Sequence, residues 1–192
     1  MSKRRKRRSP KALLALLLAL LILIPALSFA IEPIEKQIFP LPYADLIEEV
    51  ANQYNFPPSL IYAVIYTESK FDPQATSSAE AHGLMQITDS TYQWACKRSG
   101  QKAQDTQVLY DPETNIRFGV LILSLLRERF KHTETVLAAY NAGQGKVAEW
   151  LKDPAYSKDG TTLHNIPYEE TENYVHRVIN TQKRYQKLYN IL

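Results

Sequence analysis

Glu68 is the residue whose type and spacing point most directly to chemistry. It follows Ile61 by seven residues, Val64 by four and Ile65 by three, so a helix would place its carboxyl group on the same stripe as these aliphatic side chains. Burial on such a stripe disfavours the ionised form and raises the pKa of a carboxyl group toward the range of a general acid. The same spacing also fits a buried glutamate that is held by an arginine or that caps a neighbouring loop.

The other reactive side chains do not form a metal, nucleotide or nucleophile site. The glycines at 143 and 145 lack the spacer and the Ser/Thr of a P-loop. Cys96 is the only cysteine, which excludes an internal disulfide, and its helical context favours a packed thiol over a nucleophile. We therefore expect no cofactor and no metal ion. The four histidines, which lack paired zinc-ligand spacing and an HExxH sequence, are His82, His132, His164 and His176.

The elements that would position Glu68 are helical almost throughout. Apolar residues recur with a helical period from Tyr43 onward, prolines 57 and 58 open the helix that carries Glu68, and proline 73 is expected to end it near Asp72. No segment alternates with period two over a useful length, so the only strands expected are short ones beside residues 85–87. The domain is therefore predicted to be mainly α. The further helices are expected at about residues 43–54, 90–97, 113–130, 133–141, 146–151 and 170–189.

The formal net charge of +3 divides between two oppositely charged parts of the chain. Seven of the 23 lysines and arginines lie in the first 11 residues, and no acidic residue precedes Glu32. Residues 31–192 therefore carry 16 basic and 20 acidic side chains, a net charge of −4. No broad positive field would hold this part of the chain to nucleic acid, so nucleic acid is not an expected partner.

The N-terminus has the three-part pattern of a secretory signal peptide. A basic leader is followed by an apolar stretch, Ala12 to Ile24, and by small residues at 28 and 30. Residues 12–31 are also long enough to span a bilayer, so residues 1–31 are predicted to be either a signal peptide or a retained membrane anchor. The basic end would stay in the cytoplasm in both cases, which places the rest of the chain outside, in the cell envelope. Residues 32–42, with three prolines, are expected to form an extended linker to a domain spanning residues 43–192.

Four short segments between residues 68 and 175 occur in a characteristic order. They are ESKFDP from Glu68, GLMQI from Gly83, AYNAG from Ala139, and IPYEET from Ile166 followed by Tyr174-Val175. Together they resemble the motifs of the soluble-lytic-transglycosylase (SLT) type of peptidoglycan-cleaving enzymes, whose α fold is lysozyme-like and related to goose-type lysozyme. One departure is Glu80, where the family more often has glycine, and this leaves the shape of the local loop open.

The resemblance implies a lysozyme-like fold and a single catalytic acid, Glu68. It implies that Glu68 protonates the leaving oxygen of the MurNAc-GlcNAc β-1,4 bond and then takes the proton of the sugar's own C6 hydroxyl, which closes to a 1,6-anhydroMurNAc end without water. Asn141 equally fits a cap at a helix end, and Glu170 fits a first-turn glutamate favoured by the helix dipole. The residues that the resemblance assigns to substrate binding are Ser77, Gln86, Tyr140, Asn141 and Glu170.

Three functions are compatible with these residues. The first is an exported lytic transglycosylase that acts on the glycan strands of peptidoglycan and meets the membrane through its N-terminal segment if that segment stays uncleaved. The second is a hydrolytic muramidase on the same fold, in which water attacks in place of the C6 hydroxyl. The third is a non-catalytic glycan-binding protein of the envelope, which would have no use for an acid on an apolar stripe. The glycan strands of peptidoglycan are the expected partner, and which proteins bind this chain is unknown from its sequence.

Overall fold

The computed structural model describes Leu14, Ala19, Leu21, Leu23 and residues 32–191. The signal peptide or membrane anchor predicted at residues 1–31 lies almost wholly outside these described residues, and both alternatives stay predictions. Within the described part of the chain, no helix has the length and hydropathy needed to cross a bilayer. The chain divides into two compact units, residues 1–40 and 41–192.

Residues 32–38 of the first unit are helical, which contradicts the extended linker expected over residues 32–42. Pro33 lies within this helical segment, which the structure describes from Glu32 onward. Lys36 Nζ lies 2.6 Å from Glu32 Oε1, an i,i+4 ion pair that favours the helix. The helix ends before Pro40. Proline content misled the prediction because the position of a proline within a helix decides whether the helix can form.

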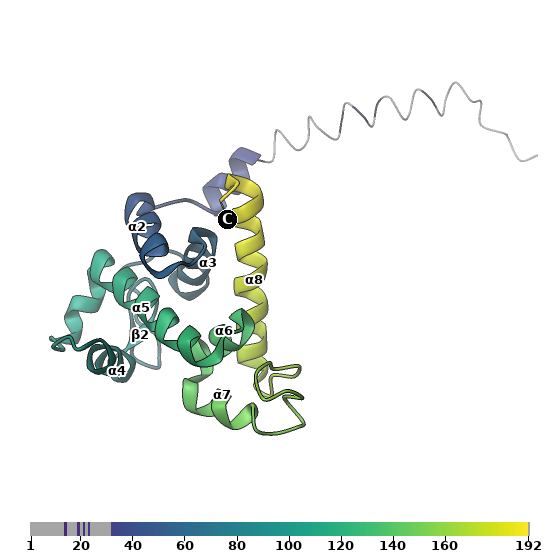
Figure 1. Cartoon of the computed structure of the whole chain (residues 1–192). Helices are drawn as coiled ribbons and strands as arrows, with labels where there is room; N and C mark the ends of the chain where they lie inside the picture. The colour runs from purple at the N-terminus through teal and green to yellow at the C-terminus, as the bar shows by residue number, and fades with distance from the viewer. Residues whose placement is uncertain (1–13, 15–18, 20, 22, 24–31, 192) are drawn as a thin grey trace, which may run out of the picture. The chain divides into compact units, whose positions relative to one another are not determined.

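The second unit is mainly α, as the sequence predicts (Figure 1). Each predicted helix is present with bounds close to those expected. A short 3-10 helix, η1, was not predicted, whereas the hairpin of β1 and β2 lies beside residues 85–87 as expected. The strands are antiparallel and pair residue 81 with 88 and 82 with 87. The elements are α2 (Ala44–Tyr54), α3 (Pro58–Ser69), β1 (Ala81–His82), β2 (Ile87–Thr88), α4 (Asp89–Ser99), η1 (Thr106–Tyr110), α5 (Pro112–Phe130), α6 (Thr133–Ala142), α7 (Gln144–Trp150) and α8 (Glu169–Tyr189).

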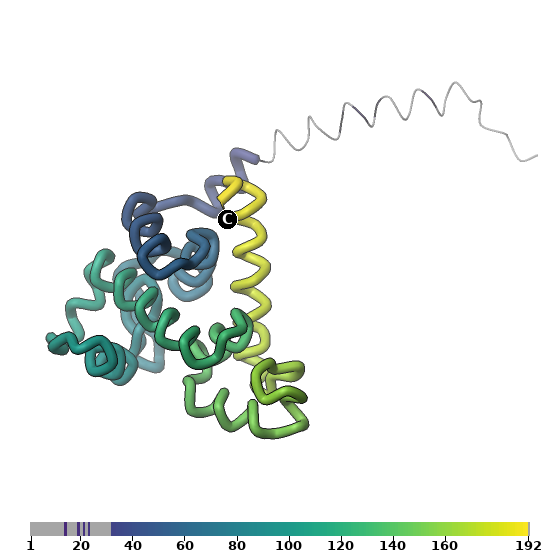
Figure 2. The backbone as a smooth tube through the Cα atoms, in the orientation of Figure 1, coloured from purple at the N-terminus to yellow at the C-terminus, as the bar shows by residue number. Residues whose placement is uncertain are grey.

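Helix α3 lies in the core of this unit. Every residue from Ser59 to Ile65 is buried, as expected for a helix that is apolar around most of its circumference. It packs against α8, the long C-terminal helix, which also contacts α6 (Figure 2). Helix α5 packs against α2, α4 and α6. Side chains from α6 and α8 are thereby brought to the last turn of α3, which carries Glu68.

The loop that faces this last turn is anchored by Asn115, a buried residue of α5. Its Oδ1 accepts a hydrogen bond from the Met85 amide at 2.8 Å, and its Nδ2 donates to the carbonyls of His82 and Leu109 at 2.9 and 2.7 Å. Gly83 must be glycine here, because its φ is +70° and an added Cβ would lie 2.2 Å from the Leu109 carbonyl oxygen. Two backbone segments, the loop at residues 82–85 and η1, are thus held on one buried amide.

Helix α3 ends at Ser69, before the proline that was expected to end it. Lys70 and Phe71 both adopt left-handed φ values, 51° and 66°, which turn the chain out of the helix. The Ser69 hydroxyl donates to the Leu84 carbonyl at 2.8 Å and so ties the helix end to the anchored loop. The turn after the helix and the hydrogen bond to the loop together fix the position of Glu68 relative to the hairpin.

Candidate active site

Glu68 lies in the last turn of α3, one residue before the helix ends, and lines a cleft of about 510 Å³. The residue is half-buried. Burial is the largest influence on its carboxyl group and raises its pKa to about 7, against smaller lowering effects of Tyr174 and Arg177. A carboxyl group with a pKa in this range can hold its proton at neutral pH, which is the condition that general acid catalysis requires.

Two tyrosine hydroxyls surround this carboxyl group. Tyr140 of α6 donates a hydrogen bond to the Met85 carbonyl at 2.8 Å. The buried hydroxyl of Tyr174, on α8, makes no hydrogen bond of good geometry within the described chain, yet it interacts with Glu68 closely enough to lower the pKa of Glu68. Burial and the nearby charge of Glu68 raise the pKa of both tyrosines well above the usual value. Both hydroxyls therefore keep their protons throughout the physiological range.

Glu68 is not held by an arginine, which was one of the alternatives for this residue, in the part of the chain that the structure describes. None of their ion pairs includes Glu68. Arg177, an exposed residue of α8, acts on the carboxyl group only through its charge, and this effect is smaller than that of burial. The acid is therefore shaped by desolvation and not by a partner cation.

The six residues that the sequence analysis singled out all lie on the same cleft. They come from α3, the loop before β1, the hairpin, α6 and α8, segments that are up to about a hundred residues apart in sequence. Their gathering in one place is a finding of the structure, while their individual roles stay predictions. The residues are Glu68, Ser77, Gln86, Tyr140, Asn141 and Glu170.

Ser77 and Gln86 shape the loop as well as facing the cleft. The Ser77 hydroxyl accepts hydrogen bonds from the amides of Ala79 and Ala81 at 3.3 and 3.2 Å. The side-chain nitrogen of Gln86 donates to the carbonyls of residues 75 and 83 at 3.2 and 2.9 Å. These bonds leave the hydroxyl proton of Ser77 and the side-chain oxygen of Gln86 as the atoms that a ligand in the cleft could use.

Glu170 lies where both of its predicted alternatives placed it, whereas Asn141 lines the cleft and is not the cap of its helix. Asn141 Oδ1 accepts a hydrogen bond from Thr171 Oγ1 at 2.8 Å and so joins the end of α6 to the first turn of α8. The helix end itself is capped by the backbone of Gly143. Glu170 is exposed in the first turn of α8 and also lines the cleft. Glu170 can therefore both interact favourably with the helix dipole and face the cleft.

The glutamate at position 80 occupies a conformation that suits glycine. Its φ is +55°, and its amide donates to the Ser77 carbonyl at 3.0 Å to close a turn. A left-handed residue other than glycine costs about 1 kcal/mol. The loop therefore keeps a glycine-like backbone in spite of the substitution, and Ser77 stays in place.

Sequence reasoning missed two residues that act on Glu68, namely Tyr174 and Arg177. Tyr174 follows the buried Thr171 by three residues, and Arg177 follows Tyr174 by three, so a helical stripe through the fourth motif could have indicated them. Cys96 is buried and its thiol has a raised pKa because of that burial, in agreement with a packed side chain. Among the described residues, no group of three or more His, Cys, Asp or Glu side chains could hold a metal ion.

Comparison with known proteins agrees with this geometry. Residues 45–162, more than half of the chain, match the model of the transglycosylase SLT domain. The chain belongs to the SLT-domain family. The soluble lytic murein transglycosylase of Escherichia coli K12 is 35% identical over 144 residues, which cover 73% of this chain and 22% of that protein. Membrane-bound lytic murein transglycosylase C of Histophilus somni is 33% identical over 172 residues, which cover 77% of this chain and 47% of that protein.

Solved structures of SLT-domain proteins have the same fold. The 70 kDa soluble lytic transglycosylase of Escherichia coli superposes with a TM-score of 0.70 and 30% identity, over 80% of this chain and 25% of that chain. An inactive glutamate-to-glutamine mutant of lytic transglycosylase Slt from Pseudomonas aeruginosa gives a TM-score of 0.67 and 33% identity, over 78% of this chain and 25% of that chain. The predicted lysozyme-like architecture is thus confirmed. This SLT-domain chain spans less than half of the length of these relatives.

Proposed function

We propose that this protein is a peptidoglycan lytic transglycosylase that cleaves the MurNAc-GlcNAc β-1,4 bond with Glu68 as its single acid and base. The observation that carries the proposal is a desolvated carboxyl group with a pKa of about 7 in a cleft lined by residues of all four SLT-like motifs. A relative that is inactive after a glutamate-to-glutamine change adds support, because such a change removes an acid while keeping its shape.

In the first step Glu68 acts as the acid. Its proton passes to the glycosidic oxygen, and the bond between that oxygen and C1 of the MurNAc residue breaks through an oxocarbenium-like transition state. A carboxyl group with a pKa near 7 is matched to this task at neutral pH, because it is both protonated often enough and acidic enough. Tyr140, which keeps its proton and lines the cleft, would orient the N-acetyl group or stabilise developing charge.

In the second step the same residue acts as the base. The Glu68 carboxylate takes the proton of the C6 hydroxyl, the C6 oxygen bonds to C1, and a 1,6-anhydroMurNAc end forms while Glu68 is reprotonated. No water is consumed and no second carboxylate is needed. Ser77, Gln86 and Asn141 would hold the acetamido and hydroxyl groups of the sugars, and Glu170 would contact the glycan at the α8 side of the cleft.

The substrate places the protein in the cell envelope. The basic leader and apolar stretch at residues 1–31 would direct the chain out of the cytoplasm, as a cleaved signal or as an anchor. Relatives named as soluble and as membrane-bound enzymes are both similar to this chain, which agrees with either form.

The test is digestion of purified sacculi with the full chain, its Glu68→Gln variant and a control variant, Glu49→Gln. The wild type and the control are expected to release muropeptides with anhydro ends, one water lighter than reducing ends, and Glu68→Gln to release none. Reducing ends would identify the hydrolytic muramidase instead. Binding to sacculi without any release by the wild type would identify a non-catalytic glycan-binding protein.

A further inference from the structure

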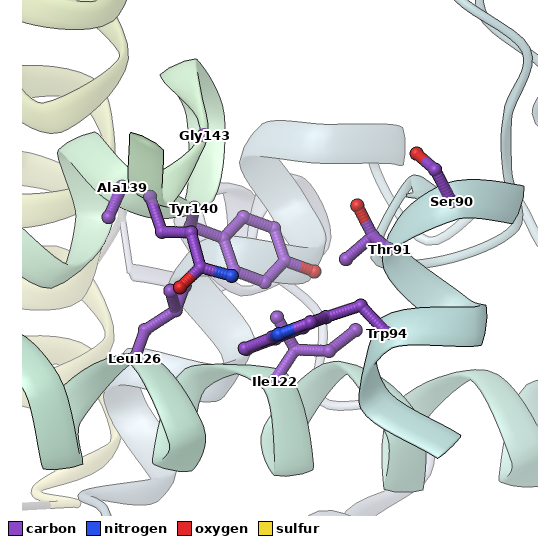
Figure 3. Close-up of a pocket in the computed structure, with 9 residues that line it drawn as sticks. Ser90, Thr91, Trp94, Ile122, Leu126, Ala139, Tyr140 and Gly143 are labelled. Carbon is purple, nitrogen blue, oxygen red and sulfur yellow. The ribbon is translucent and has the colours of Figure 1, made fainter. Parts of the chain in front are cut away.

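The cleft that holds Glu68 continues past Tyr140 into a second pocket of about 280 Å³ (Figure 3). The two hollows share four lining residues, Thr91, Ile122, Tyr140 and Gly143. Because these residues belong to both walls, a chain-like ligand in the cleft can pass from one hollow to the next. The second pocket is therefore an extension of the candidate active site along α4, α5 and α6.

The walls of this extension are aromatic, with a polar rim. Figure 3 shows the indole of Trp94, from α4, facing the ring of Tyr140 across the pocket, with Ile122 of α5 beneath them. The hydroxyls of Ser90 and Thr91 stand at one side. Flat apolar faces combined with a few hydroxyl groups suit a sugar ring, which has an apolar face and a polar edge.

Beyond Trp94 lies a third hollow of about 400 Å³, which shares Trp94 and Gln144 with the second. Its charged residues are Arg98 of α4 and Arg129 and Glu128 of α5. Arg129 Nη1 donates to Gln144 Oε1 at 2.7 Å, so the amide is already oriented. Arg98 is exposed and has no ion pair with any described residue. The end of the extended cleft thus has a local charge of +1 within a domain that is negative as a whole.

We propose that this extension binds a carboxylate carried by the muramoyl residue of the glycan, with Trp94 packed against the sugar and Arg98 and Arg129 facing the anion. The inference rests on the proposed function. Each muramoyl residue carries a lactyl group, whose carboxylate is free in a peptide-free strand and is amide-linked to an anionic peptide in a substituted strand. Guanidinium groups suit a carboxylate of either source, because their planar donor sets match its two oxygens.

The experiment measures binding of three ligands to the full chain carrying Glu68→Gln, which prevents cleavage. The ligands are peptide-bearing glycan strands, peptide-free glycan strands and neutral chito-oligosaccharides of similar length. Adding Arg98→Gln is expected to weaken binding of an anionic strand about three- to fivefold at low salt, the size of an exposed charge contact, and to leave the neutral ligand unchanged. A selective effect on one kind of strand identifies which carboxylate is bound.

Three further variants check the assignment. Lys97→Gln removes the same charge from the neighbouring exposed position outside the hollow and is expected to change nothing. Glu128→Gln is expected to strengthen binding of the anionic strands. Trp94→Ala is expected to weaken all three ligands about fivefold, whereas Trp94→Phe, which keeps an aromatic face and the packing, retains most of the binding.

The proposal is overturned if Arg98→Gln and Lys97→Gln behave alike, or if Arg98→Gln weakens the neutral ligand as much as the anionic strands. Products of the enzyme with an intact Glu68 are a separate readout. Anhydro ends released equally by the wild type and by Arg98→Gln, without charge-selective binding, would refute this inference and leave the proposed function standing. Absence of any product from the wild type would refute the proposed function itself.

Discussion

Glu68 and Glu49 are glutamates on two helices that pack together, α3 and α2, and their surroundings move their pKa values in opposite directions. Burial raises the pKa of Glu68 to about 7. Glu49 is exposed, and the hydrogen bond and charge of Arg117 lower its pKa. Arg117 Nη1 lies 2.9 Å from Glu49 Oε1, and its Nε lies 2.9 Å from Glu113 Oε1. The surroundings of Glu68 remove its carboxyl group from water, whereas the carboxyl group of Glu49 stays in water and pairs with a cation.

Desolvation, and not the presence of a charge partner, therefore makes Glu68 suited to act as a general acid. Arg117 joins α5 to α2 through Glu49 and pairs with Glu113 within α5, and such exposed pairs contribute little to stability because water and salt screen them. Arg177 also places a positive charge near Glu68, but the burial effect exceeds it. The general acid of this cleft is therefore identified by how far its carboxyl group is removed from water, and not by a nearby cation.

The largest expected difference between the two glutamates is in activity. Glu68→Gln is expected to lower the rate of release of anhydro muropeptides by about 10³-fold, because the amide can neither donate nor accept the proton. Glu49→Gln should leave the rate within about twofold of the wild type, since it touches no residue of the cleft. The measurement is initial-rate muropeptide release from sacculi. A comparable loss in both variants would show that the contrast between the regions has no catalytic meaning.

The second difference is in stability against pH. Because the pKa of Glu68 is raised on folding, its contribution to stability is fully present below about pH 4.5 and is lost as the pH rises to about 7. Glu68→Gln is therefore expected to match the wild type near pH 4 and to be more stable at pH 8, by at most roughly 3 kcal/mol. Urea denaturation of both proteins at several pH values measures this. A variant that is less stable than the wild type at pH 8 would contradict burial as the cause.

A smaller effect is expected from Tyr174→Phe, which keeps the ring and removes the hydroxyl that faces Glu68. The hydroxyl lowers the pKa of Glu68, so its loss should raise that pKa further. The alkaline limb of the kcat/KM profile, which reports the protonated acid in the free enzyme, should move to higher pH. Tyr62→Phe, which alters a buried tyrosine outside the cleft, is the matched control and should leave the limb in place. An unmoved limb in Tyr174→Phe would show that Tyr174 does not act on the acid.

The smallest effect is expected for Arg117, which forms exposed ion pairs with Glu49 and Glu113. Arg117→Gln removes both ion pairs and should cause a loss of stability smaller than the gain from Glu68→Gln at pH 8, and high salt should abolish it by screening. Thermal denaturation at low and high ionic strength compares the variant with the wild type. A large loss of stability that persists in salt would mean that Arg117 holds α2 to α5 by packing and not by charge. The contrast between an exposed, charge-paired Glu49 and a desolvated Glu68 would then not hold.

Most of the helices could be predicted from the sequence, because their apolar residues recur with a helical period and their ends carry prolines and glycines. The extended linker predicted over residues 32–42 was wrong, because residues 32–38 are helical although they contain Pro33. The 3-10 helix η1 was missed because five residues are too few for a periodic signal. Local patterns thus predict long elements well and short ones poorly.

The candidate site divides in the same way. Residue spacing alone showed that Glu68 lies on an apolar helical stripe and that the other three motifs follow it in order, and the six residues chosen on that basis do share one cleft. The folded chain was needed to show that Tyr174 and Arg177 act on the acid, and that the cleft runs on to Trp94 and the arginines. This is because a pKa depends on how much water is removed and on which groups replace it. Both depend on the packing of α8 against α3 and of α6 against α8, which residue spacing within one helix does not contain.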